Sequence, residues 1–234
     1  KCVQISHRKL EGMIYRNAIE VKNLTKKYNG FTLNNISFEL PTGCILGLIG
    51  ENGAGKSTTI KALLDSIKYE GEIKIFGQKC SAEIKNKIGV VLDEIGFPTS
   101  FNAKDVNMVM KNSFTKWDEK KYYEYIEKFS LPTDKAFSDF SKGMKMKLGI
   151  AAALSHNAEL LILDEPTSGL DPLIRDEIVD ILNDFTREEF LHRSHTGVYE
   201  KKRFVVYRNE RERREAKMSL GFKIREKFFA QVID

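Results

Sequence analysis

The sequence lacks a long hydrophobic run and contains few cysteines, and each absence excludes a class of protein. The 234 residues include no uninterrupted apolar run of about 18 residues, the length that a membrane-spanning helix needs. Cys2, Cys44 and Cys80 are odd in number and form no CxxC pair. This argues against a disulfide framework or a zinc site and favours a reducing compartment. Residues 1–17 contain no apolar core typical of a secretory signal.

Most of the chain has no excess of basic over acidic residues. The formal net charge is +5. Residues 191–234 hold 12 Lys and Arg against 6 Asp and Glu, which leaves 26 against 27 in the other 190 residues. A domain that follows a nucleic acid would carry a basic face. We therefore expect no nucleic-acid partner, and only the tail is basic.

The chain does contain a succession of strand patterns. Residues 13–40 alternate polar and apolar side chains, which predicts antiparallel strands with one wet face. Residues 43–50 and 158–166 contain short continuous apolar runs, typical of strands buried on both faces. Residues 70–77 and 87–94 predict two more strands.

Helical patterns fill most of the remaining sequence. Residues 97–154 have few strand signals and predict an all-helical insertion, and residues 172–190 predict an amphipathic helix with Pro172 in its first turn. Its apolar face comprises Ile174, Ile178, Ile181, Leu182 and Phe185. Strands that alternate with helices predict an α/β protein with a mostly parallel core sheet, an antiparallel β subdomain and a helical subdomain.

Residues 50–58, GENGAGKST, match the phosphate-binding pattern G-x-x-x-x-G-K-[ST]. They follow a buried strand and open a helix, as a P-loop requires. Glycines let the backbone N–H groups curl around phosphates, and the helix start adds partial positive charge. Lys56 can reach the β- and γ-phosphates, and Ser57 can ligate Mg²⁺. The predicted nucleotide contacts are Gly50, Asn52, Gly53, Ala54, Gly55, Lys56, Ser57 and Thr58.

The run LLILDEP (160–166) places two carboxylates at the end of a buried strand. The carboxyl ends of strands in α/β folds border the crevice that binds ligands. Asp164 is the candidate Mg²⁺ ligand, and Glu165 is the candidate general base for an attacking water. The competing interpretation, a strand-end cap, is less favourable downstream of a P-loop.

The order of four motifs resembles the ATP-binding subunit of ABC transporters. GENGAGKST is followed by FSKGM (140–144), which resembles the family's signature motif, then by LLILDEP and by SGLD (168–171), which resembles its D-loop. Tyr28 occupies the place of an aromatic residue that stacks on adenine. The resemblance covers about residues 17–190, and it is greatest to the bacterial drug- and peptide-export branch, in which an ATPase serves a separate membrane permease.

This resemblance implies partners and a location. Two cassettes pair head to tail with two ATP molecules between them, so Ser141 and Gly143 would contact the γ-phosphate held by the other cassette, and Asp171 would bridge the interface. Taken alone, Ser141 is an ordinary helix N-cap. The helical insertion would dock a permease, and the chain would lie in the cytoplasm on the inner face of the membrane.

The sequence departs from the family pattern at two motifs. Asp93 stands where the family has a glutamine, and as a carboxylate it can bind Mg²⁺ or its waters but cannot donate a hydrogen bond. In the signature, Lys142 replaces a glycine and Met144 a glutamine.

After residue 190 the resemblance stops. The preceding EEFLHR is a poor buried strand. His195 lies 30 residues after Glu165 and follows Ser194, which makes it a candidate switch histidine, although a surface histidine is the simpler interpretation. Residues 208–217 predict a solvated helical face, and residues 222–233 an amphipathic segment for a membrane surface or partner. A frameshift would also produce this loss of pattern.

The sequence therefore predicts an ABC-type ATP-binding domain over residues 13–190, an atypical basic tail over 191–234 and an upstream extension over 1–12. Its function would be ATP hydrolysis that powers an exporter, with ATP and Mg²⁺ as cofactors. One alternative is a cassette that binds ATP but hydrolyses it poorly, because the last strand and the switch histidine are altered. Another is a non-transport ABC protein acting on nucleic acid, which would usually carry two cassettes or coiled-coil insertions.

Overall fold

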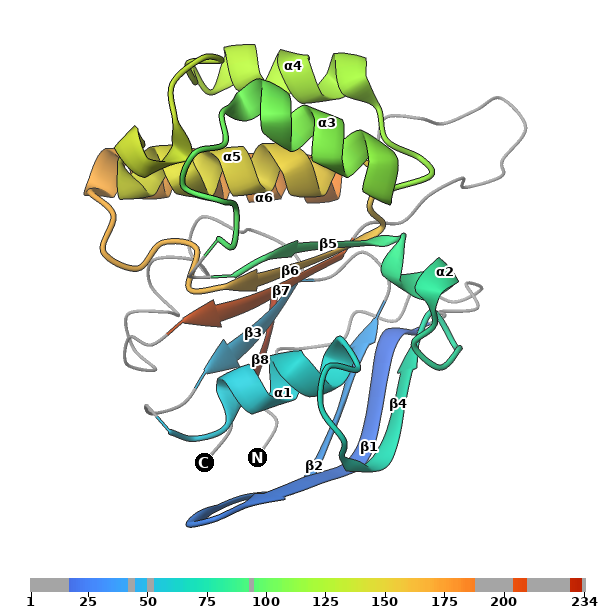
Figure 1. Cartoon of the computed structure of the whole chain (residues 1–234). Helices are drawn as coiled ribbons and strands as arrows, with labels where there is room; N and C mark the ends of the chain where they lie inside the picture. The colour runs from blue at the N-terminus through green and yellow to red at the C-terminus, as the bar shows by residue number, and fades with distance from the viewer. Residues whose placement is uncertain are drawn as a thin grey trace.

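A computed structural model describes residues 17–41, 45–49, 53–92, 95–187, 204–209 and 228–232 (Figure 1). Its strands are β1 (Asn17–Tyr28), β2 (Phe31–Pro41), β3 (Ile45–Ile49), β4 (Glu70–Ile75), β5 (Ile88–Val91), β6 (Leu160–Asp164), β7 (Phe204–Asn209) and β8 (Phe228–Val232). Its helices are α1 (Lys56–Leu63), α2 (Ala82–Lys85), α3 (Ala103–Ser113), α4 (Glu119–Lys128), α5 (Lys142–Leu154) and α6 (Pro172–Arg187), with a 3₁₀ turn η1 (Phe137–Asp139). None of these helices is long and apolar enough to cross a membrane.

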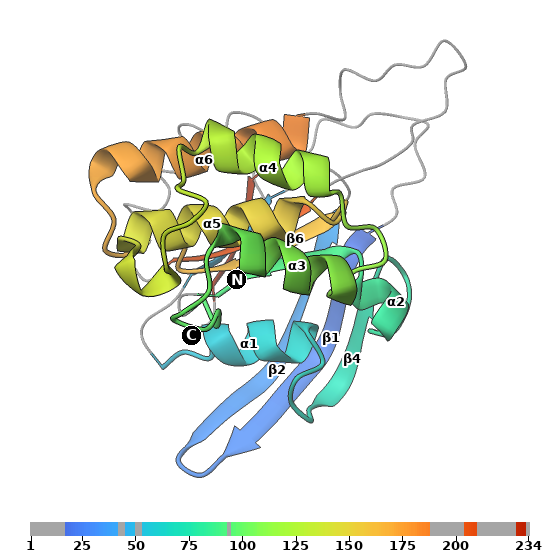
Figure 2. The same cartoon turned by 45° about the horizontal axis from the view of Figure 1, so that its top comes forward.

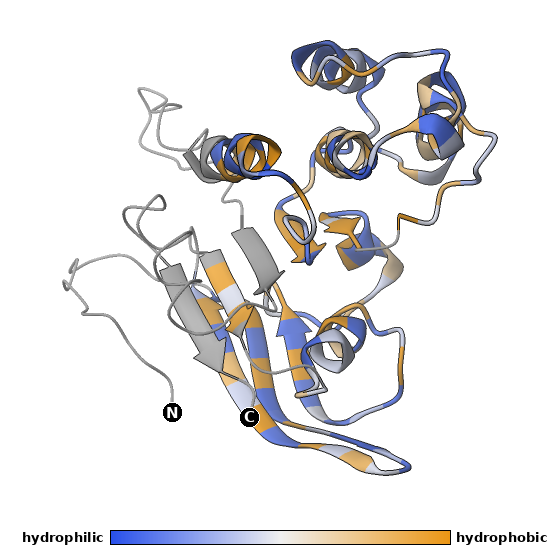
Figure 3. Ribbon diagram, turned by 90° about the vertical axis from the view of Figure 1, so that its left-hand side faces the viewer, coloured by the Kyte–Doolittle hydropathy of each residue, from blue (hydrophilic) through white to orange (hydrophobic). Residues whose placement is uncertain are grey.

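Strands β1, β2 and β4 form an antiparallel sheet in the order β2-β1-β4. Hydrophobic and hydrophilic residues alternate along its strands (Figure 3). The apolar side chains, such as Ile19, Val21 and Ile73, are buried against α1, while Lys22 and Glu39 are exposed. The pattern of residues 13–40 thus predicted this sheet from its period of two.

The second sheet is parallel, with the order β5-β6-β7-β3-β8. Strand β6 is buried on both faces. Leu160 and Ile162 pack with α1 and the antiparallel sheet, whereas Leu161 and Leu163 pack with the helices on the other side. This explains the continuous apolar run, since a strand covered on both faces has no wet side.

Helices α3 to α6 cover one face of the parallel sheet, and α1 lies on the other face beside the antiparallel sheet (Figures 1 and 2). The helices α3, α4 and α5 occupy the predicted insertion, and α6 buries Ile178, Leu182 and Phe185 on one face. The predicted α/β architecture with its antiparallel and helical parts is therefore confirmed.

Two strands come from the segment after residue 190, and here the expectations for the tail need correction. Strand β7 lies between β6 and β3, and β8 pairs with the other edge of β3. Arg208 and Asn209 are therefore strand residues rather than the start of a helix, and residues 228–232 belong to the sheet rather than to a surface segment. The run Phe204–Tyr207 consists of β-branched and aromatic residues, which favour a strand. The strand pattern is difficult to recognise in the sequence because charged residues flank this short run on both sides.

Candidate functional site

The loop that enters α1 ends in glycines with left-handed backbones. The φ angles of Gly53 and Gly55 are 87° and 99°, conformations that glycine adopts without strain. A Cβ on Gly55 would also lie 2.7 Å from Leu33 Cδ1 and 3.0 Å from Phe31 Cζ. The positive φ therefore strongly favours glycine at position 55, and a Cβ there would also displace the ends of two side chains. Gly53 to Thr58 of the predicted phosphate contacts lie in the described chain, while Gly50 and Asn52 lie outside it.

The first turn of α1 is fixed by a residue that the motif does not single out. The carbonyl of Gly55 accepts hydrogen bonds from Thr59 N at 2.8 Å and from Thr59 Oγ1 at 3.0 Å, and Thr59 is fully buried. Lys56 opens the helix and is only 2% exposed. A buried lysine at the first position of a helix, where the backbone N–H groups lack intrahelical partners, suits the binding of an anion.

The end of β6 holds the two predicted carboxylates. Asp164 is the last residue of β6 and is partly buried, and Glu165 follows it with 5% of its surface exposed. The φ angle of Glu165 is 55°, an uncommon value for a residue with a side chain. Its carbonyl accepts a hydrogen bond from Ser168 N at 3.0 Å, which closes a tight turn. The local backbone is thus bent sharply where the carboxylates lie.

The sheet brings the P-loop and these carboxylates to one edge. Asp164 of β6 and Leu48 of β3 both pair with the same residue of β7, Arg208. Because the strands are parallel, their carboxyl ends lie on the same side (Figure 1). This is the side at which open α/β sheets bind ligands. The end of the strand before the P-loop and the two carboxylates therefore lie at the same edge of the sheet.

The signature residues lie at the start of α5, which packs against the start of α6. Ser141 is the exposed N-cap of α5, and its Oγ accepts a hydrogen bond from Met144 N at 3.2 Å. Gly143 is buried, and a Cβ there would lie 3.2 Å from Ile174 Cγ2 of α6. The simple helix-cap interpretation of Ser141 is therefore correct, and the close packing explains the glycine.

The SGLD loop lies beside the signature helix. Asp171 is exposed, and its Oδ1 accepts a hydrogen bond from Ile174 N at 3.0 Å at the start of α6. Arg175 Nη2 donates to the carbonyl of Leu170 at 3.4 Å, a contact that the sequence motifs did not indicate. A Cβ on Gly169 would lie 3.4 Å from Lys142 Nζ, so the lysine that departs from the family pattern lies over this loop.

Tyr28 lies at the end of β1 and is 45% exposed. Its ring is stacked with that of Phe31 at a centroid distance of 6.4 Å, and Lys26 Nζ lies 5.2 Å from its centroid. An exposed aromatic ring of this kind can stack on a planar base.

The described chain supplies two candidate oxygen donors for Mg²⁺, from Ser57 and Asp164. No group of three or more His, Cys, Asp or Glu that could hold a metal occurs within the described residues. Mg²⁺ at phosphate sites commonly takes one or two protein oxygens and completes its shell with phosphate and water. A serine hydroxyl at Ser57 and a carboxylate at Asp164 fit that chemistry. Asp93, the third candidate metal ligand, lies outside the described residues, and so does His195, the candidate switch histidine.

A family model described as ABC transporter matches residues 33–168, more than half of the chain. The chain belongs to the ABC transporter family. It is 38% identical over 184 residues to the bacitracin transport ATP-binding protein BcrA of Enterococcus faecalis, covering 75% of this chain and 59% of that protein. It is 37% identical over 174 residues to the lantibiotic transport ATP-binding protein SrtF of Streptococcus pyogenes, covering 73% and 76%.

Solved structures confirm the ABC fold. The structure of an ATP-binding subunit of an ABC transporter superimposes with a TM-score of 0.68 at 23% identity, covering 82% of this chain and 79% of that chain. A dimeric ATP-binding cassette bound to ADP and Pi gives 0.66 at 21% identity, covering 82% and 88%. The predicted resemblance is confirmed, and the relatives named above match the export branch. The chain spans 59% and 58% of the lengths of two bacitracin transport relatives.

Proposed function

We propose that this chain is the ATP-binding and ATP-hydrolysing subunit of a bacterial membrane exporter. The observation that supports this most is the common edge of the sheet, where buried Lys56 begins α1 and buried Glu165 follows β6. Phosphoryl transfer needs little beyond such positioning and charge stabilisation. The relatives named for antibiotic transport support the export direction.

The proposed roles follow from the chemistry of each side chain. Lys56 and the N–H groups of α1 hold the phosphates, Tyr28 stacks on adenine, and Glu165 takes a proton from the attacking water. Ser57 and Asp164 would hold Mg²⁺, which supplies charge neutralisation at the phosphates when it is bound. Asp93 would be a further oxygen ligand, and His195 would polarise the γ-phosphate.

Two cassettes would form the complete site. Ser141 and Asp171 are exposed at the starts of α5 and α6, so a second cassette can reach both. Each signature helix would close the nucleotide site of the other cassette, whether the two cassettes are identical or different. A membrane permease would dock on the helical subdomain, which places the cassette peripherally on the inner face of the membrane.

The hydrolysis-deficient alternative finds no support among the relatives. That alternative supposes an altered last strand, whereas β7 pairs with both β6 and β3. The transported substrate depends on the permease, so we assign none.

The test is the mass of the Glu165→Gln variant in solution, measured by light scattering with and without Mg-ATP. Loss of the general base should trap ATP between two cassettes, so the mass should double from the monomer value of 26.8 kDa. Glu165→Gln combined with Lys56→Ala is the control, and it should stay monomeric. A Glu165→Gln chain that binds ATP but stays monomeric would contradict the proposed pairing, and a wild-type chain that does not bind ATP would contradict the function itself.

A further inference from the structure

We propose that Phe31 is a positioning residue that joins the adenine platform to the phosphate loop. The inference rests on the proposed binding of ATP and deepens it, because it assigns a role to a residue outside the known motifs. One aromatic ring contacts both halves of the nucleotide site.

The first contact is with Tyr28. The two residues flank the turn between β1 and β2, and their rings stack at a centroid distance of 6.4 Å and an interplanar angle of 23°. Tyr28 is 45% exposed, whereas Phe31 is partly buried and packs against the core beneath the antiparallel sheet. The buried ring therefore supports the exposed one and limits its rotamers.

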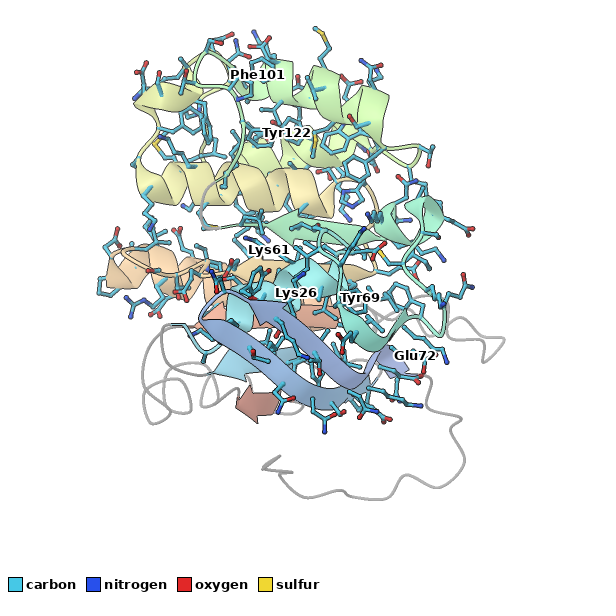
Figure 4. All side chains as sticks on the ribbon, turned by 60° about the horizontal axis from the view of Figure 1, so that its bottom comes forward. Lys26, Lys61, Tyr69, Glu72, Phe101 and Tyr122 are labelled. Carbon is cyan, nitrogen blue, oxygen red and sulfur yellow. The ribbon has the colours of Figure 1, made fainter. Side chains whose placement is uncertain are left out.

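The second contact is with the P-loop. Phe31 Cζ lies 3.0 Å from the position of a Cβ on Gly55, which has a φ of 99°. Its ring tip therefore lies directly over the glycine that precedes Lys56. Residues of the β1–β2 hairpin and of α1 belong to one hydrophobic cluster, and Figure 4 shows this hairpin in front of α1. A shift of this hairpin would move the adenine platform and the loop together.

The two contacts predict different effects for two substitutions. Phe31→Leu keeps apolar bulk over Gly55 but removes the ring beneath Tyr28, so only the adenine half should suffer. Phe31→Ala removes both contacts, so the phosphate half should suffer as well. Phe31→Tyr keeps the ring and should behave as the wild type.

The experiment is calorimetric binding of Mg-ATP and of Mg-tripolyphosphate, which lacks the base, to the full chain. Phe31→Leu should weaken ATP binding by about 2- to 12-fold, the factor that corresponds to one aromatic pair, and leave tripolyphosphate binding unchanged. Phe31→Ala should weaken both ligands. Tyr28→Ala combined with Phe31→Leu should bind ATP no more weakly than Tyr28→Ala alone, because the ring acts through Tyr28. Ile36→Ala, at another partly buried position on β2, is the matched control and should change neither ligand.

Each result either supports or overturns the inference. If Phe31→Leu binds ATP like the wild type while Tyr28→Ala is weakened, Phe31 does not position the platform. If Phe31→Leu and Ile36→Ala both weaken the binding of ATP and of tripolyphosphate to the same extent, the role of Phe31 is purely structural. A wild-type chain that binds neither ligand would instead overturn the proposed function. Thermal unfolding of each variant identifies any that do not fold. In that case the Phe31→Tyr variant, which keeps the ring, should bind both ligands like the wild type, and weaker ATP binding by folded Phe31→Tyr would overturn the inference.

Discussion

Ser141 illustrates how one side chain can have a local and a proposed functional role. Its Oγ already accepts a hydrogen bond from Met144 N and so caps α5. The same hydroxyl can still donate its proton to a phosphate oxygen, because an alcohol is donor and acceptor together. The capping geometry therefore does not compete with a phosphate contact.

Substitution of Ser141 can separate the two roles. Ser141→Ala should lower the free energy of unfolding by about 1 kcal/mol through loss of the cap, and Ser141→Asn should restore it. In the Glu165→Gln background, both variants should lose ATP-driven dimerisation, because neither has the hydroxyl. Urea unfolding and light scattering measure the two effects, and a Ser141→Ala chain that still dimerises with ATP would contradict the phosphate contact.

Thr59 offers a second test at the residue scale. Its hydroxyl donates to the carbonyl of Gly55, so Thr59→Val should lower the free energy of unfolding by about 1 kcal/mol. ATP binding should also weaken, because the Gly55 carbonyl in the P-loop loses one of its two hydrogen-bond donors. Exposed Thr32→Val on β2 is the control, and it should leave calorimetric ATP binding unchanged. Equal binding by both variants would contradict a role in shaping the loop.

His156 should make the fold sensitive to acid. Its ring is 1% exposed, stacks on Phe114, and has nitrogens 3.4 Å and 3.2 Å from the carbonyls of Ala152 and Ile88. Burial lowers its pKa below the ordinary value of 6.5. The unfolded chain therefore takes up a proton first, so this contribution to stability is complete above the ordinary pKa and is lost as the pH falls below it. The unfolding temperature should decline less between pH 7.5 and 5.5 in His156→Gln than in the wild type, and parallel declines would refute this.

At the scale of elements, α5 lies unusually close to β5 because a strand glycine allows it. A Cβ on Gly89 would lie 2.6 Å from the carbonyl oxygen of Ala153, and one on Gly149 would lie 2.7 Å from Ile95 Cδ1. The signature helix α5 is thus packed closely against β5 and the residues that follow it.

Enlarging Gly89 should force these elements apart. Gly89→Ala should lower the free energy of unfolding by about 1–3 kcal/mol, because backbone atoms cannot yield like a flexible side chain. Gly96→Ala is the matched control, since a Cβ there meets nothing within 4 Å. Urea denaturation measures both, and equal midpoints for the two variants would contradict the close packing.

The sequence predicted most elements because their signals are local. The P-loop, the alternation in β1 and β2 and the apolar run of β6 each lie within a few consecutive residues. The roles of Thr59, Phe31 and Gly89 depend instead on contacts that exist only after folding. The hydrogen bonds of Arg175 to the SGLD loop were likewise unpredictable, since an arginine on a predicted amphipathic helix is ordinarily a solvent-facing residue.

At the scale of the whole molecule, the parallel sheet depends on β7. Strands β3 and β6 carry the P-loop and the two carboxylates, yet they do not pair with each other, and β7 joins them. The two halves of the proposed site are therefore held in register by residues 204–209.

Disrupting β7 should separate the two halves. Val206→Pro removes a backbone N–H from the middle of a strand paired on both sides, so we expect a loss of at least about 3 kcal/mol and of ATP binding. Circular dichroism during urea unfolding and calorimetric titration with ATP measure these effects. Wild-type stability of Val206→Pro would contradict the central place of β7.

The position of β7 also has a consequence for synthesis. Ribosomes add about 5–20 residues per second from the N-terminus, so β3 and β6 emerge before their shared neighbour. Until Asn209 has left the exit tunnel, the edges of both strands offer unsatisfied hydrogen-bonding groups to chaperones or to other nascent chains. Premature termination anywhere before β7 would therefore release a chain in which nothing joins β3 to β6, so that the P-loop and the two carboxylates would not be held at one edge of the sheet.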